Sequence, residues 1–250
     1  MMPPLSPEEE AHSRAVTALI GERVRAAGGW LPFDQFMELA LYAPGLGYYS
    51  AGSVKLGPGG DFVTAPEVSD LFSRCVARQC AQVLAGGGDI LELGAGTGRM
   101  AAVILKTLAA GGTLPGRYAI LEVSADLAQR QQQRLGRLPR ELRERVVWLD
   151  RLPERPLRGV ILANEVLDAL PCRRFVLMGG RMRELGVALS EGALLERDAA
   201  PDEALASACA ELLSELPEAL PEGYSSELCL RVAPWIAGVA ECLERGSMLL

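Results

Sequence analysis

The chain has 250 residues, of which 49% are hydrophobic, and its formal net charge is −7. This length allows one sizeable hydrophobic core, or one core with a smaller appendage, and no apolar run approaches the roughly 18 residues that a membrane span needs. The negative charge argues against nucleic acid as a partner, because phosphates require a basic surface. The acidic N-terminal segment MMPPLSPEEEAHSR has neither secretory nor transit-peptide features, so we expect a cytoplasmic protein.

Cysteine and histidine are too scattered to indicate a metal site. None of the six cysteines forms a CxxC pair, and the only histidine is His12. We therefore expect reduced thiols and no disulfide framework. A zinc site would lack ligands, and a histidine-dependent nucleophilic triad would have to use His12.

The first third of the chain is predicted to be helical. Helices are expected over 1–30, 33–42 and 66–84, with a glycine-rich loop over 43–62 between the second and the third. The predicted apolar face of the third helix consists of Val68, Leu71, Phe72, Cys75, Val76, Val83 and Leu84. The N-terminal helical segment and its loop are assigned to residues 1–85.

From residue 86 onward, short apolar runs alternate with helical patterns. The expected strands are 89–93, 118–123, 145–149 and 159–163, and the expected helices are 99–110, 125–135 with Ser124 as its N-cap, and a short one after the fourth strand. Strands that alternate with helices indicate a mostly parallel sheet covered on both faces, an α/β fold. We assign residues 86–250 to this domain.

Residues 173–197 interrupt the alternation. They are predicted to form a small antiparallel β insertion with turns at Gly179–Gly180 and Glu191–Gly192. A helix over 202–215, a proline-rich linker and a long helix over 226–244 are expected next, and the final GSMLL is expected to begin another buried strand.

The stretch ILELGAGTGRM, residues 90–100, places three glycines between the first strand and its helix. A dinucleotide fingerprint would need a third glycine at position 99, where the chain has Arg99. The spacing E-x-G-x-G-x-G instead resembles the first motif of class I S-adenosylmethionine-dependent methyltransferases, which have a Rossmann-like fold. An alternative is that the glycines serve only close packing between strand and helix.

This resemblance implies S-adenosyl-L-methionine as the cofactor. Glu122, at the end of the second strand, would bind the ribose hydroxyls. Asp150, after the third strand, would bind the adenine amino group, or else be a solvated loop residue. The full set of expected cofactor-binding residues is Thr64, Pro66, Glu92, Gly94, Ala95, Gly96, Gly98, Glu122, Val123, Ser124, Asp150 and Asn164.

Three further stretches, FMELALYAPGLGYYS, GGDFVTAPEVSDLF and ILANEVLDALPCRRF, resemble the MidA-type methyltransferase family. Its relatives include the mitochondrial complex I assembly factor that methylates an arginine of a complex I subunit. The resemblance implies an arginine-containing protein substrate, and a homodimer is possible. Family members continue beyond the sequence that aligns with Leu250, so we expect a C-terminally truncated chain.

Strand order 3-2-1-4-5 would place the loop after the fourth strand opposite the glycine loop. The expected catalytic residues are therefore Asn164, Glu165, Asp168 and, from an earlier segment, Glu67. Glu165 is the first choice for binding a guanidinium. Glu227, much later in the chain, is the last candidate for this role. Structural alternatives remain open for each. Thr64 and Glu67 fit a capping box, and residues 164–168 fit the cap and first turn of a helix.

Two other functions remain as alternatives. A nucleotide-dependent oxidoreductase could have the same α/β fold, although Arg99 in place of the third glycine of the dinucleotide fingerprint argues against it. A non-catalytic assembly or binding module could keep the cofactor fold.

Overall fold

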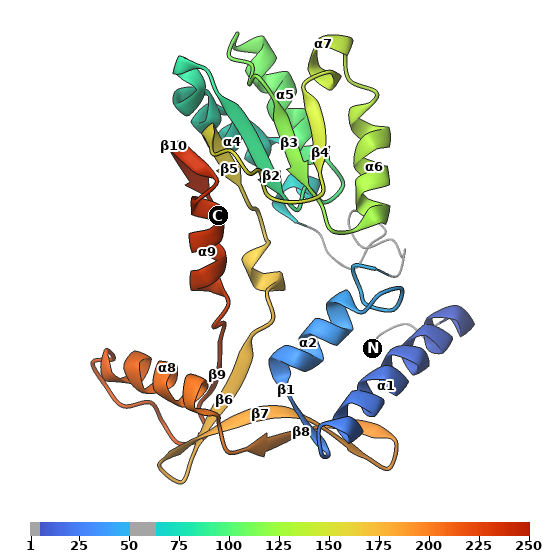
Figure 1. The fold of residues 1–250 in the computed structure, drawn as a ribbon, viewed down its shortest axis with the longest axis vertical. Coiled ribbons are helices and arrows are strands. Elements are labelled where there is room, and N and C mark those ends of the chain that lie inside the picture. Colours follow the sequence, from blue (N-terminus) through green and yellow to red (C-terminus); the bar gives the residue numbers. More distant parts are fainter. Residues whose placement is uncertain (1–5, 51–63) are drawn as a thin grey trace. The chain divides into compact units, whose positions relative to one another are not determined.

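The computed structural model describes residues 6–50 and 64–250 (Figure 1). They belong to two compact units, each made of two chain segments. The β unit combines Met1–Ala51 with Leu170–Ala233, and the α/β unit combines Gly52–Ala169 with Pro234–Leu250. This interleaved division differs from the expected sequential one at residue 85, because the β insertion groups with the N-terminal helices. Residues 51–62 of the expected loop, and the start of GGDFVTAPEVSDLF, lie outside the described residues.

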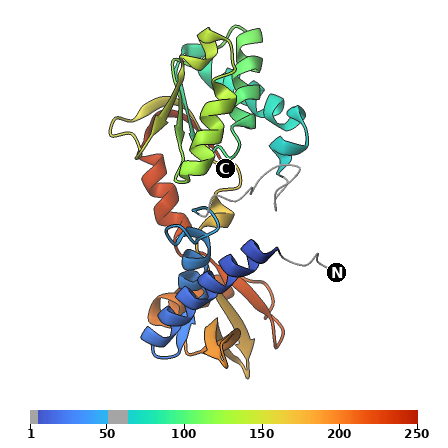
Figure 2. The same ribbon diagram turned by 90° about the vertical axis from the view of Figure 1, so that its right-hand side faces the viewer.

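The α/β unit contains a five-stranded parallel sheet, visible in Figures 1 and 2. Its strand order is β10-β5-β2-β3-β4. The strands are β2 (Asp89–Leu93), β3 (Tyr118–Leu121), β4 (Val146–Leu149), β5 (Leu157–Leu162) and β10 (Leu243–Leu249). If these five strands are numbered along the chain and read across the sheet from β4, their order is 3-2-1-4-5. This confirms the four predicted strands and their predicted arrangement, and the GSMLL segment belongs to the fifth strand, β10.

Helices cover both faces of this sheet. They are α3 (Ala65–Val68), α4 (Asp70–Val83), α5 (Arg99–Ala110), α6 (Ala125–Leu135), α7 (Arg140–Arg143) and α9 (Val232–Ala240), with 3-10 turns η1 (Leu84–Gly86) and η2 (Leu167–Ala169). Neighbouring residues of β2 point to opposite faces, as in any strand. Ile90 packs with Ile104 of α5, while Leu91 packs with Val239 of α9. The α/β fold predicted from the alternating pattern is therefore confirmed.

The β unit is built on an antiparallel sheet with the strand order β1-β7-β6-β9, and β8 also pairs with β7. The strands are β1 (Trp30–Pro32), β6 (Arg173–Met178), β7 (Arg181–Ser190), β8 (Ala193–Ala199) and β9 (Ser225–Leu228). The helices are α1 (Pro7–Ala26), α2 (Phe33–Tyr42) and α8 (Glu203–Ser214). Both predicted turns are present, with positive φ at Gly179, Gly180, Glu191 and Gly192.

Several predicted element boundaries are wrong. The first helix ends at Ala26 rather than at residue 30, before two glycines with positive φ, and the strand β1 between it and α2 was not predicted. The predicted helix over 226–244 is instead the end of β9, α9 and the start of β10. Residues 225–228 pair with β6, and this pairing with a distant strand overrides the local helical pattern.

The predicted helix over 66–84 is broken at Ser69, whose backbone is extended and whose hydroxyl accepts a hydrogen bond from the Leu71 amide. The predicted apolar face is partly wrong as a result. Val68 and Leu71 are 70% and 69% exposed, and Cys75 is exposed. The buried residues of α4 are small: Ser73, Ala77 and Cys80. Phe72, Val76 and Val83 pack against the core as expected.

Candidate functional site

The glycine loop between β2 and α5 has a left-handed backbone at each of its three glycines. The φ angles are 66° at Gly94, 52° at Gly96 and 75° at Gly98, a region that favours glycine. A β-carbon at Gly94 would lie 3.2 Å from Val166 Cγ2, and one at Gly98 would lie 3.3 Å from Gln131 Cα. Two of the glycines therefore serve the packing of the protein itself, which supports part of the packing alternative.

The contact between Gly94 and Val166 brings the loop after β5 against the glycine loop. Asn164, Glu165 and Asp168 flank Val166 in this loop, and the last two are exposed. The expected α-helix is a single 3-10 turn, so the helix-cap and helix-dipole explanation for these residues is wrong. Glu165 has a φ of 52°, a conformation that costs a residue with a side chain of order 1–3 kcal/mol.

Hydrogen bonds join α3, the short helix before α4, to the glycine loop and to the start of α5. The Glu67 carboxylate accepts a hydrogen bond from the Thr97 hydroxyl, and Arg99 Nη1 donates to the Glu67 carbonyl oxygen at 2.6 Å. Arg99 Nη2 also pairs with Asp70 Oδ1 at 3.0 Å. The predicted capping box is wrong, because the side chain of Thr64 makes no cap hydrogen bond. Glu67 is instead directed to the glycine loop.

Glu122 directly follows β3, at the same edge of the sheet as the glycine loop. Its Oε1 accepts the Ser124 amide at 3.0 Å and its Oε2 accepts Gln131 Nε2 at 2.9 Å. The predicted cap is confirmed, since the Ser124 hydroxyl accepts the Leu127 amide. Val123 is 81% exposed. A fixed carboxylate thus stands beside an uncovered apolar side chain.

Gln131 was not predicted to belong to the site. It is fully buried, and its Nε2 donates to the Gly96 carbonyl oxygen at 2.9 Å as well as to Glu122. Its Oε1 accepts Trp148 Nε1 at 3.1 Å. A signal was present in the sequence: residue 131 lies midway between Leu127 and Leu135 on the apolar face of α6, where an amide must find buried partners.

Glu92 lies in β2 beneath the glycine loop and is 1% exposed. Its Oε2 accepts the Tyr118 hydroxyl at 2.7 Å. Burial raises the pKa of the Glu92 carboxyl from 4.5 to about 7, the Tyr118 hydrogen bond partly opposes this, and the negative charge of Glu122 adds to it. Ala95 is also buried, and its backbone carbonyl oxygen accepts a hydrogen bond from the Gly98 amide. Cofactor contacts of Glu92 and Ala95 remain predictions.

The raised pKa of Glu92 predicts a stability that depends on pH. The folded state favours the neutral carboxyl. The contribution of Glu92 to the free energy of unfolding is therefore fully present below about pH 4.5 and is lost as the pH rises through about 7. We expect Glu92→Gln to be more stable than the parent at pH 8 by up to about 3 kcal/mol, and the difference to vanish near pH 4.5. Urea unfolding across this pH range tests it. Parallel pH profiles for the two proteins would contradict the assignment.

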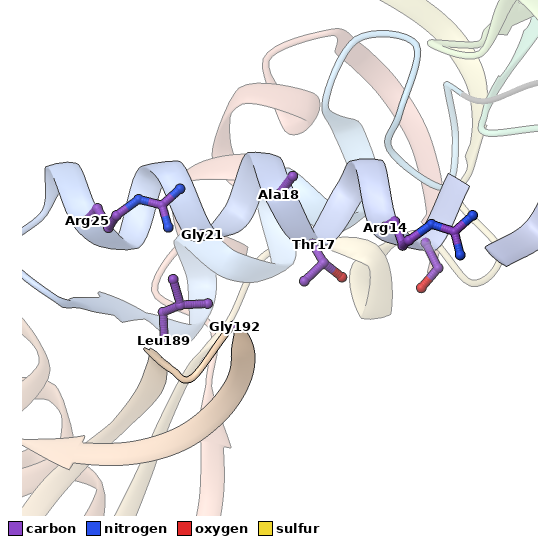
Figure 3. Close-up of a pocket in the computed structure, with 8 residues that line it drawn as sticks. Arg14, Thr17, Ala18, Gly21, Arg25, Leu189 and Gly192 are labelled. Atoms are coloured by element: carbon purple, nitrogen blue, oxygen red, sulfur yellow. The ribbon is translucent and has the colours of Figure 1, made fainter. Parts of the chain in front are cut away.

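The remaining expected residues are less closely tied to the glycine loop. Asp150 is exposed after β4 and Pro66 is buried in α3, and among the described residues no hydrogen bond or ion pair joins either of them to the loop. Glu227 lies in the β unit, where Cys172 Sγ donates to its Oε2 at 3.4 Å. A pocket of about 400 Å³ also belongs to the β unit (Figure 3). It lies between α1 and the β7–β8 turn and contains none of the predicted site residues.

Comparison with known proteins gives a family match. The model of the S-adenosyl-L-methionine-dependent methyltransferase family matches residues 75–250. A crystal structure of a protein from Burkholderia thailandensis with bound S-adenosyl-homocysteine has a TM-score of 0.90 and 39% identity. That similarity covers 99% of this chain and 64% of the other.

Curated relatives are similar at lower identity. The mitochondrial protein arginine methyltransferase NDUFAF7 homolog of Drosophila melanogaster is 29% identical over 222 residues, 77% of this chain and 51% of the relative. Its Danio rerio counterpart is 29% identical over 185 residues, 64% of this chain and 43% of the relative. The chain spans about half the length of these relatives.

The mitochondrial names of these relatives do not support the expected cytoplasmic location. No helix among residues 6–50 and 64–250 has the length and apolar character to span a membrane.

Proposed function

Because the chain belongs to the S-adenosyl-L-methionine-dependent methyltransferase family, we propose that it transfers a methyl group from this cofactor to an arginine guanidinium of a protein substrate. The cofactor follows from the family. The arginine acceptor is supported by the names of the curated relatives. The single structural observation that supports the reaction is the meeting of two loops at the contact between Gly94 and Val166, since one loop bears the glycines and the other bears exposed acids.

The residues present fit the cofactor. The Glu122 carboxylate is held by the Ser124 amide and by Gln131 Nε2, and a negatively charged acceptor at this place is the kind of group that binds ribose hydroxyls. The exposed Val123 offers an apolar surface for the adenine ring, and the exposed Asp150 offers an acceptor for its amino group. When bound, S-adenosylmethionine supplies an electrophilic methyl group on a sulfonium.

The acids around the loop contact suit a guanidinium acceptor. A guanidinium is a planar cation whose N–H groups pair with carboxylates, and it must be held about 3 Å from the methyl carbon. Glu165 and Asp168 supply exposed carboxylates, Asn164 supplies an amide, and Glu67 supplies a third carboxylate beside the glycine loop. In this proposal Glu165 binds the guanidinium and accepts the proton that it loses on methylation.

Transfer of label tests the proposal. The protein is incubated with methyl-labelled S-adenosylmethionine and an arginine-containing peptide library, beside a matched library in which lysine replaces arginine. We expect label only in the arginine library, recovered as methylarginine after hydrolysis. Label in the lysine library alone would reject the arginine acceptor but keep the methyltransferase. Binding of S-adenosylhomocysteine without transfer to either library would favour the non-catalytic module.

A further inference from the structure

We infer that Gln131 is a positioning residue that fixes Glu122 in the orientation needed to bind the cofactor ribose. The inference rests on the proposed role of Glu122 and assigns a function to a residue outside the glycine loop and the strand ends. Its basis is a set of three hydrogen bonds made by one buried amide: to Glu122, to the Gly96 carbonyl oxygen and from Trp148.

The amide of Gln131 uses both of its N–H groups and its oxygen in hydrogen bonds to residues of the site. Both protons of Nε2 are used, one on Glu122 Oε2 and one on the Gly96 carbonyl oxygen, each at 2.9 Å. The Trp148 indole donates to Oε1, which decides which end of the amide is the nitrogen. Because the side chain is fully buried, water cannot replace these partners if they are lost.

These bonds join three separate strand ends. Gly96 belongs to the loop after β2, Glu122 follows β3, and Trp148 lies in β4. Gln131 itself is on α6, so it connects the helix to all three. The α6 backbone also packs directly against the loop, because a β-carbon at Gly98 would lie 3.3 Å from Gln131 Cα. Gln131 therefore ties the Glu122 carboxylate to the glycine loop, in addition to the backbone hydrogen bond from the Gly94 amide to the Leu121 carbonyl oxygen at 3.0 Å.

Fixing Glu122 matters because a free carboxylate would lose rotational freedom when the cofactor binds. The Ser124 amide holds Oε1 and Gln131 holds Oε2, so the carboxylate keeps a constant orientation. Preorganisation of this kind lowers the cost of binding without adding any contact to the ligand. Gln131 is expected to affect the ribose interaction specifically, although it does not touch the ribose.

The test measures how strongly each protein prefers one ligand over another, as the ratio of two dissociation constants. Binding of S-adenosylhomocysteine and of its analogue without the ribose hydroxyls is measured by calorimetry for the parent and for Gln131→Met. We expect the parent to prefer S-adenosylhomocysteine about tenfold or more, since hydrogen bonds to a charged group are lost in the analogue. In Gln131→Met the preference should fall to about twofold. Gln131→Asn, which keeps the amide but is too short to reach both acceptors, should give an intermediate preference and serves if the first variant does not fold.

Leu135→Ala is the matched control. Leu135 lies one turn further along α6 and is buried in the core, so its truncation destabilises the same helix without touching the loop. We expect this control to lower the melting temperature while the parent ligand preference is kept. An unchanged preference in both Gln131 variants would overturn the inference and leave the role of Glu122 intact. Absence of any preference in the parent would overturn the ribose role of Glu122 and, with it, this inference.

Discussion

Replacing Glu165 with glycine is expected to raise the melting temperature of the protein and to reduce methyl transfer at least about 100-fold. The rise follows from the φ of 52°, which glycine adopts freely and glutamate does not. Relief of about 1 kcal/mol corresponds to a rise of roughly 2–4 °C in a chain of this size. The loss of transfer follows from removal of the carboxylate proposed to hold the guanidinium. Strain kept at a residue that also carries chemistry is typical of functional sites.

Glu191→Gly is the matched control for this prediction. Glu191 is the other residue with a side chain and a positive φ in the described part of the chain, at 50°, and it lies in the exposed turn between β7 and β8. We expect the same rise in melting temperature and unchanged transfer. Thermal unfolding and labelled-methyl transfer measure the two effects separately.

A second substitution at Glu165 separates charge from backbone strain. Glu165→Gln keeps a side chain at the strained position and removes only the negative charge. We expect its melting temperature to match the parent, its transfer to be lost, and its affinity for S-adenosylhomocysteine to be unchanged. Full transfer by the glutamine variant would remove Glu165 from the reaction and direct attention to Asp168 and Glu67.

Replacing Arg173 with methionine is expected to destabilise the β unit by about 3–5 kcal/mol. Arg173 lies in β6 and is 9% exposed. Its Nε donates to Glu184 of β7 at 2.5 Å, and its Nη1 and Nη2 both donate to Asp202 Oδ2 at 3.1 Å. Glu184 is 1% exposed, so loss of the guanidinium would leave a buried carboxylate without its positive partner.

Asp202 gives this network a second structural role. Its Oδ1 caps α8 by accepting the Leu205 amide at 2.9 Å, while Oδ2 binds Arg173. Loss of Arg173 should therefore loosen the start of α8 as well as the β6–β7 pair. Hydrogen exchange should show faster amide exchange in both places, and urea unfolding should give the loss of stability.

Arg183→Met provides the comparison for Arg173→Met. Arg183 lies in β7 and pairs with Asp198 at 2.8 Å, but their side chains are 38% and 40% exposed. Water can replace an exposed pair, so we expect a much smaller loss of stability. Equal losses in the two variants would show that burial of Glu184 does not govern the effect.

Much of the α/β unit could be predicted because its signals are local. Each strand is a short apolar run, and each helix has a repeat of apolar residues, so the alternation alone indicated the parallel sheet. The order 3-2-1-4-5 was predicted from the usual arrangement of open α/β sheets, and the structure confirms it. The Ser124 cap was also predicted, since a cap depends on neighbouring residues. The strands β1 and β9 were missed because each forms only by pairing with a distant strand.

The sequence by itself determined the α/β fold, the family to which the glycine loop points, and the acids near the strand ends, because each depends on residues close together in the chain. Only the tertiary structure decided which partners those residues have. It directed Glu67 to Thr97 rather than to a helix cap, buried Glu92 against Tyr118, and joined Glu122 to the glycine loop through Gln131. Hydrogen bonds and burial between segments 9 to 35 residues apart depend on how the chain packs, which no local pattern records.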